Sequence, residues 1–196
     1  MPGNDRGHAG RGGRGAAPPN SGVKQLSGPE PHASLPGNPD VISALNTVLK
    51  NELTAINQYF LHSRMLGDWG LSILAKKEYD ESVDEMKHAD RLIRRILFLG
   101  GLPNLQYLDK LFIGEDVQDV LGCDLRLEQN SLPDLQAGIA LCERVGDFVS
   151  RELFVHILES EEEHIDWLQT QFRLIEQMGL QNFVQLQTKP NESGTD

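Results

Sequence analysis

A Glu-x-x-His spacing occurs twice in the chain, as Glu85 to His88 and as Glu161 to His164, each time inside a long segment with helical periodicity. Residues three apart lie side by side on a helix, so each pair offers a carboxylate and an imidazole to one point. A single pair of this kind is frequent on a solvated helix face. Two copies on segments long enough to cross a helical bundle favour a metal site.

Two further glutamates, Glu52 and Glu128, lie on apolar helix faces. Glu52 follows Leu45 and Leu49 by seven and three residues, and Glu128 follows two leucines at the same offsets. An ionised carboxylate buried without a partner costs on the order of several kcal/mol, or its pKa shifts until it is neutral. The same segments supply no Lys or Arg at comparable inward positions, so a metal ion is the better partner.

These residues together form a recognised ligand set: one glutamate from each of two helices and a Glu-x-x-His pair from each of two others, as in di-iron carboxylate bundles. Four carboxylates balance two divalent cations, and mixed carboxylate and imidazole donors suit Fe(II), Mn(II) or Zn(II) better than Cu(I). Tyr59 is either a core tyrosine or a hydrogen-bonding neighbour of the metals, and His62 and His156 are expected to be satisfied or at the surface. The predicted ligands are Glu52, Glu85, His88, Glu128, Glu161 and His164.

Hydrophobic periodicity predicts four long helices, over about 38–67, 71–100, 116–146 and 147–178, and a short fifth helix near 181–187. Asn38 and Pro39 are typical of a helix start, and Pro133 is expected to kink or interrupt the third helix. Residues 101–115 lack a helical period and should form a long connection. The pattern predicts an all-α four-helix bundle with one long crossover and a short C-terminal helix.

Length and composition are consistent with one domain carrying tails. The chain has 196 residues and a formal net charge of −11. No apolar run is long enough to span a bilayer and no signal peptide is apparent, so a cytoplasmic protein without membrane contacts is expected. Cys123 and Cys142 fall about 28 Å apart in one predicted helix and should be reduced.

Residues 1–37 differ in composition from the rest of the chain. They are rich in Gly, Pro and Arg and carry a net charge of +2, which leaves −13 for the remainder. We expect a disordered tail at 1–37, an ordered bundle at 38–188 and a flexible tail at 189–196. The acidic body argues against nucleic acid as the main ligand, and the tail would bind nucleic acid weakly if at all.

Four stretches of the ordered part resemble the bacterioferritin family. They are 51–60, which begins Asn51-Glu52-Leu53, and 84–91, 96–106 and 162–167. The resemblance extends over about 38–188 and includes all six predicted ligands in order and spacing. It implies a ferritin-like fold and a ferroxidase centre in which Glu85 and Glu161 are the bridging carboxylates.

The resemblance also implies an activity, cofactors and partners. The family oxidises Fe(II) at a di-iron centre of two Fe ions per subunit and stores Fe(III) as a mineral inside a 24-subunit cage built from dimers. Met86 matches the axial ligand of a haem b shared between two subunits, although from the residues alone Met86 would be filler in a dimer interface. An electron-donating ferredoxin is implied for iron release, while the oxidant, O2 or H2O2, the haem occupancy and co-assembly with a second ferritin subunit are left open.

Two features depart from the family pattern, and other functions fit less well. The tail at 1–37 is not usual, and Asp80 stands where some relatives have a His associated with iron traffic, which leaves the iron route past Asp80 open. A di-iron oxygenase would need a substrate channel or further domain. A rubrerythrin-like peroxidase would need four Cys where two exist, and a non-catalytic cage subunit would have lost a ligand.

Overall fold

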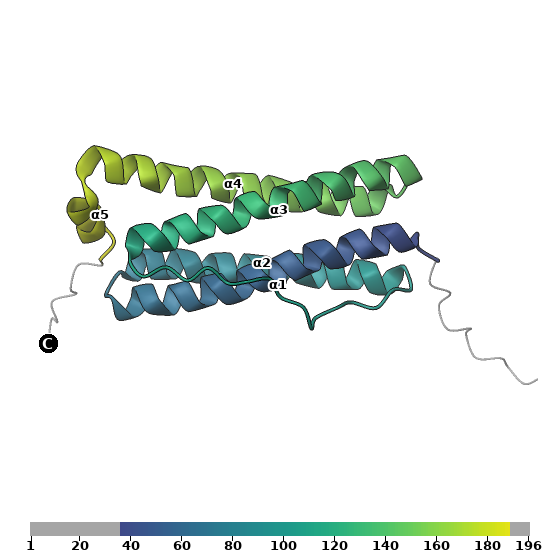
Figure 1. Cartoon of the computed structure of the whole chain (residues 1–196), viewed down its shortest axis with the longest axis horizontal. Helices are drawn as coiled ribbons and strands as arrows, with labels where there is room; N and C mark the ends of the chain where they lie inside the picture. Colours follow the sequence, from purple (N-terminus) through teal and green to yellow (C-terminus); the bar gives the residue numbers. More distant parts are fainter. Residues whose placement is uncertain (1–35, 189–196) are drawn as a thin grey trace, which may run out of the picture. The chain divides into compact units, whose positions relative to one another are not determined.

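A computed structural model describes residues 36–188, which form a bundle of four long helices with a short fifth helix. The helices are α1 (Pro39–Asp68), α2 (Ser72–Phe98), α3 (Val117–Val145), α4 (Phe148–Met178) and α5 (Leu180–Leu186). The α1–α2 hairpin lies against the α3–α4 hairpin, and the crossover runs along the outside of the first (Figure 1). The predicted fold class is confirmed. The expected tails fall almost wholly outside the described residues.

Side-chain caps fix where three of the long helices begin. Asn38 accepts a hydrogen bond from the Asp40 amide at 2.8 Å, and Pro39 occupies the first turn, where no amide hydrogen is needed. Asp116 and Asp147 cap α3 and α4 in the same way, through the amides of residues 119 and 150. The expected helix boundaries therefore agree with the structure to within one or two residues.

Pro133 does not interrupt α3, which is helical from Val117 to Val145. Proline removes one hydrogen bond of the helix, to the carbonyl of Gln129, and of the two expected outcomes, a kink or an interruption, the interruption is wrong. The rest of the helix compensates by packing, since Leu135 and Cys142, which follow the proline, are fully buried. Both cysteines are free and buried, as expected.

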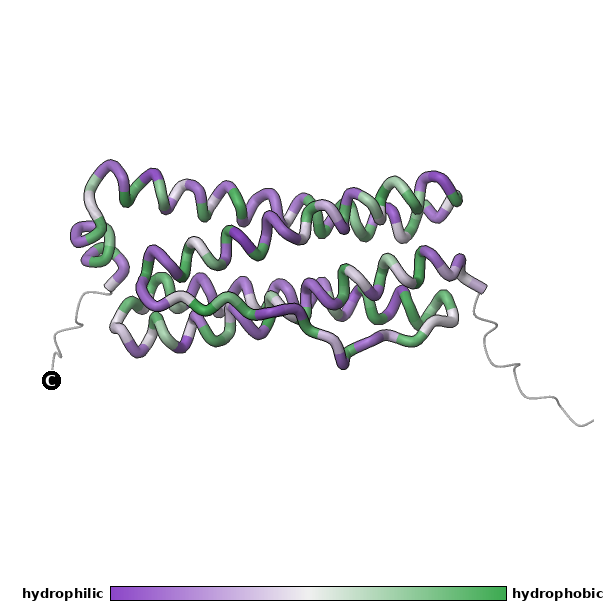
Figure 2. The backbone as a smooth tube through the Cα atoms, in the orientation of Figure 1, coloured by the Kyte–Doolittle hydropathy of each residue, from purple (hydrophilic) through white to green (hydrophobic). Residues whose placement is uncertain are grey.

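The interior consists of two apolar clusters with a polar layer between them. One cluster lies at the end of the bundle where α1 begins, around Leu45, Leu92 and Phe154, and the other lies where α1 ends, around Leu66 and Leu121. Along α1, α2 and α3 the buried polar residues fall between the two clusters, and on α4 Glu161 and His164 do so. Apolar and polar residues alternate along each helix in Figure 2, as they do when one face is buried. The polar layer is where functional groups gather.

The crossover is held to the bundle by polar side chains of α1. The amides of four crossover residues donate to Asn46 Oδ1, Thr54 Oγ1, Gln58 Oε1 and His62 Nε2, at 2.7, 3.0, 2.9 and 3.2 Å. The donors are the amides of Asn104, Asp109, Phe112 and Gly114. A segment without its own secondary structure thus finds its hydrogen-bond partners on one helix face.

Gly114 lets the crossover pass close to the start of α3. A Cβ at this position would lie 2.3 Å from the Val120 backbone nitrogen, so a larger residue would displace the chain.

Within residues 36–188 no helix is long and apolar enough to cross a membrane.

We predict that Phe154→Ala will destabilise the bundle by about 3–5 kcal/mol, because this fully buried ring fills the first apolar cluster and its loss leaves a cavity. Phe148→Ala is the matched control on the same helix. Its side chain is exposed and its loss should cost less than about 1 kcal/mol. Urea unfolding followed by far-ultraviolet circular dichroism measures both, and equal losses would contradict the assignment of the core.

Candidate metal centre

The six predicted ligands lie in the polar layer, on all four long helices. Glu52 comes from α1, Glu128 from α3, and the two Glu-x-x-His pairs come from α2 and α4. None of the six residues is more than 6% exposed, although four are carboxylates. The apolar stripes of the helices place them there, because each glutamate lies on the same face as its buried leucine neighbours.

One half of the centre surrounds His88. Its Nδ1 lies 3.2 Å from Glu52 Oε2, 3.0 Å from Glu85 Oε2 and 3.8 Å from Glu161 Oε1. The candidate ligand atoms of these four residues all lie within 4.8 Å of one another. This is the spacing at which one ion can contact several donors at once.

The other half surrounds Glu128. His164 Nδ1 lies 2.8 Å from Glu128 Oε1, and the Tyr59 hydroxyl donates to the same oxygen in a short hydrogen bond. Tyr59 also meets the His164 ring edge-on, with centroids 5.4 Å apart. Glu161 hydrogen-bonds Glu128 and so connects the two halves. The structure thus brings all six residues and Tyr59 into one cluster.

Burial raises the pKa of three of the four carboxyls. It raises the pKa of Glu52 to about 7, and it raises the pKa values of Glu85 and Glu161 well above the ordinary value, with neighbouring carboxylates adding to the effect. Burial alone would also raise the pKa of Glu128, but hydrogen bonds from Glu161, His164 and Tyr59 lower it. Without metal, protons therefore offset part of the negative charge.

The donor set fits divalent cations. The groups that contact the four carboxylates are two imidazoles, one phenol and the carboxylates themselves, with no Lys or Arg among them in the described residues. Such a cluster needs positive charge, as protons or as metal ions. Oxygen and imidazole donors suit Fe(II), Mn(II) and Zn(II).

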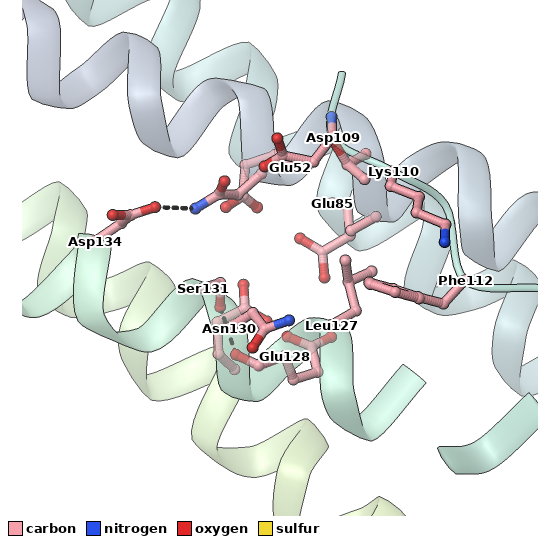
Figure 3. A pocket seen from close by; sticks show the side chains of 14 residues that line it. Glu52, Glu85, Asp109, Lys110, Phe112, Leu127, Glu128, Asn130, Ser131 and Asp134 are labelled. Carbon is pink, nitrogen blue, oxygen red and sulfur yellow. Dashed lines mark hydrogen bonds between the residues drawn. The ribbon is translucent and has the colours of Figure 1, made fainter. Parts of the chain in front are cut away.

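A cavity of about 290 Å³ leads from the cluster to the crossover. Glu52, Glu85 and Glu128 point into it in Figure 3, and Lys110 and Phe112 of the crossover lie at its side. Asp109 and Lys110 are exposed, so the cavity reaches the surface. At its other edge the Asn51 amide donates to Asp134 at 2.9 Å and joins α1 to α3.

Sequence reasoning missed a second buried polar group beside the centre. Glu78, Asp124 and His62 are fully buried, with ligand atoms within 4.8 Å of one another. A signal was present, because Asp124 precedes Glu128 by four residues and Glu78 precedes Glu85 by seven, spacings that keep each pair on one helix face. His62 is satisfied, as expected, and His156 is exposed.

The remaining residues singled out by sequence lie outside the cluster. Met86 is 46% exposed, on the same face of α2 as Tyr79, which is also exposed. Asp80 pairs with Lys76 in a short contact at the surface. Asp84, which lies one turn before His88 on α2, pairs with Lys87 at 2.5 Å.

A four-helix bundle that buries two glutamates and two Glu-x-x-His pairs in one layer defines the ferritin-like class. A family model described as "Ferritin-like domain" matches residues 42–178. A bacterioferritin of Brucella melitensis is 46% identical over 80% of this chain and 97% of its own length. One of Rhodobacter capsulatus is 45% identical over 81% and 99%, and a bacterial ferritin of Pseudomonas aeruginosa is 46% identical over 78% and 99%. The chain belongs to the bacterioferritin family.

We predict that the melting temperature of the metal-free protein falls as pH rises from about 5 to about 8. Carboxyls whose pKa is raised in the folded state bind protons more tightly there than in the unfolded chain. Their stabilisation is complete below the unfolded value of 4.5 and is lost as pH rises through the folded value, about 7 for Glu52. Scanning calorimetry across this range measures it.

Two comparisons test whether the change of melting temperature with pH comes from the buried carboxyls of the metal centre. Glu52→Gln should flatten the dependence, because the amide does not titrate, and Zn(II) should abolish most of it by replacing the protons. A melting temperature that rises with pH over this window would contradict the prediction.

Proposed function

We propose that the protein is a cytoplasmic iron store whose subunit oxidises Fe(II) to Fe(III) at the six-residue centre. The observation that carries the proposal is the buried cluster of four carboxylates and two imidazoles, which no Lys or Arg of residues 36–188 contacts. Family membership supports iron storage. The proposed ligands are Glu52, Glu85, His88, Glu128, Glu161 and His164, with Glu85 and Glu161 bridging.

The geometry explains why such a centre would favour oxidation. Two Fe(II) ions are the substrate, and each gives up one electron, so the pair supplies two electrons to the oxidant, O2 or H2O2. Buried carboxylates stabilise Fe(III) more than Fe(II), because the interaction grows with the charge of the ion. Incoming cations displace the protons that Glu52, Glu85 and Glu161 hold in the metal-free protein.

The carboxylate-lined cavity supports a path for Fe(II) from the surface. It is lined by the exposed Asp109 and by the buried Glu52, Glu85 and Glu128 (Figure 3). Glu161 lines it as well. A channel with acidic walls raises the local concentration of cations.

The exposed face of α1 and α2 supports dimer formation around a haem. Phe60, Tyr79 and Met86 are each more than 40% exposed, and the Arg64 guanidinium lies 4.8 and 5.3 Å from the centroids of the two rings. An exposed thioether among aromatic side chains fits a group bound between two subunits.

The proposal includes haem b with Met86 as axial ligand, dimers assembling into a 24-subunit cage, and a ferredoxin as electron donor for iron release.

We predict that Glu52→Ala, Glu128→Ala and His164→Ala each slow rapid Fe(II) oxidation by about 10²-fold or more, because each removes a donor from the centre. Asp84→Ala is the matched control, since it removes a carboxylate one turn from His88 that pairs with Lys87 outside the cluster. Stopped-flow absorbance at two Fe(II) per subunit gives the rates. Wild-type rates in all three variants would refute the assignment.

We predict that Met86→Leu abolishes the haem Soret band while dimers and cages still form, because leucine keeps the apolar volume without the sulfur. Met65→Leu, on α1, is the control and should bind haem normally. Visible spectra recorded during size-exclusion chromatography test both properties together. An unchanged spectrum in the Met86 variant would place the haem ligand elsewhere.

A further inference from the structure

The second buried group, Gln58, His62, Glu78 and Asp124, resembles a metal site in composition but not in hydrogen bonding. The Gly114 amide donates to His62 Nε2 at 3.2 Å, so that nitrogen carries no proton. The proton of the neutral ring is then on Nδ1, which faces the Asp124 oxygens at 2.8 and 3.0 Å. With one nitrogen accepting and the other donating, His62 has no lone pair left for a metal.

Asp124 joins the two α1 side chains that hold the crossover. It accepts hydrogen bonds from His62 Nδ1 and from Gln58 Nε2, the latter at 2.8 Å. Gln58 Oε1 in turn accepts from the Phe112 amide at 2.9 Å, and His62 Nε2 accepts from the Gly114 amide. The positions of two crossover residues thus depend on one buried carboxylate of α3.

Glu78 is the unusual member, because among the described residues no N–H or hydroxyl group donates a hydrogen bond to either of its buried side-chain oxygens, and its carboxyl neighbour is Asp124. An ionised carboxylate in that position would be buried without a donor, beside Asp124. If Glu78 is neutral, its charge no longer repels the Asp124 carboxylate, and its hydroxyl can donate a hydrogen bond to Asp124. Burial, then the charge of Asp124, raises the pKa of Glu78 well above its ordinary value, which agrees with the geometry.

The charged and titratable groups around Glu78 come from α1, α2 and α3. Glu81 and Lys77 of α2 act on it in opposite directions and pair with each other in a short contact. Asp124 of α3 and His62 of α1 complete the group. On the α4 side, His164 Nδ1 lies 3.8 Å from Glu81. Lys77 pairs with Glu81 and lies over the Trp167 ring. This cation therefore does not neutralise Glu78 in place of a proton.

We propose that Gln58, His62, Asp124 and Glu78 form a proton-dependent latch that positions the crossover at the mouth of the metal cavity, with the required proton on Glu78. Phe112, which the latch holds, lines that cavity together with Asp109 and Lys110. When Glu78 loses its proton, two adjacent carboxylates repel each other, Asp124 shifts, and the hydrogen bonds to the Phe112 and Gly114 amides weaken. The consequence for the cavity rests on the proposed metal centre, whereas the latch itself does not.

Hydrogen exchange of the metal-free, assembled protein tests the latch directly. Protection factors of the Phe112 and Gly114 amides should fall by up to about tenfold per pH unit between the ordinary carboxyl pKa of 4.5 and the raised pKa of Glu78, because the closed latch binds the proton more tightly than the open one. The Asp109 amide is an internal reference. It bonds to Thr54 outside the latch, and its protection factor should stay constant.

Three variants separate the latch from general destabilisation. Glu78→Gln mimics the protonated state and should keep both amides protected from about pH 6 to about pH 9, and Asp124→Asn should also remove the pH dependence by removing the neighbouring charge. Glu81→Gln, a nearby carboxyl on the same helix, should retain it. The infrared difference between wild type and Glu78→Gln should contain the carbonyl stretch of a protonated carboxylic acid.

The outcomes are distinct from those that test the metal centre, because no iron is present. If the wild-type amides show constant protection over this pH range, or if Glu78→Gln shows the same fall as wild type, the latch is refuted. Absence of the carboxylic acid band would refute the assignment of the proton to Glu78. The prediction that the ligand variants lose Fe(II) oxidation is tested in a separate experiment, and its outcome does not depend on the latch.

Discussion

The structure depends on the electrostatic cost of burying carboxylates inside a helical bundle. Glu52, Glu85, Glu128 and Glu161 are all almost fully excluded from water, and within the part of the chain that the structure describes only two imidazoles and one phenol contact them. A bundle of this size gains its stability from the two apolar clusters on either side, which hold the polar layer in place. The layer therefore remains a site of unmet charge, and protons or divalent cations must enter it. The proposed metal binding follows from the same constraint that makes the layer unfavourable for folding.

Protons and cations are alternative occupants of this layer. Three carboxyls of the centre have raised pKa values, whereas hydrogen bonds lower the pKa of Glu128. An asymmetric arrangement of this kind keeps one anion fixed as an acceptor for Tyr59 and His164 and leaves the others to exchange protons for metal. The cluster can thus remain folded without metal and still bind it, because neither state leaves four bare charges in the interior.

Much of the fold and the site could be predicted from sequence, because both depend on local periodicity. Helix faces follow from apolar spacing and helix starts from caps such as Asn38 and Asp116, and a glutamate that shares a face with buried leucines must point inward. Two features could not be predicted. Pro133 lies within an unbroken helix because tertiary packing outweighs one lost hydrogen bond. The partners of Gln58 and His62 depend on the path of the crossover, which has no periodicity to indicate its position.

The long crossover explains why buried polar groups extend beyond the six candidate ligands. Its backbone amides have no helix or sheet of their own, so the bundle must supply acceptors, and α1 does so with side chains spaced by four residues, Thr54, Gln58 and His62. Two of these acceptors reach inward to Asp124, whose charge then has to be tolerated next to Glu78. A connection that joins two hairpins is in this way tied to the protonation of a residue on α2. The same segment borders the cavity to the metal centre, so the topology that creates the bundle also couples its surface to its buried charge.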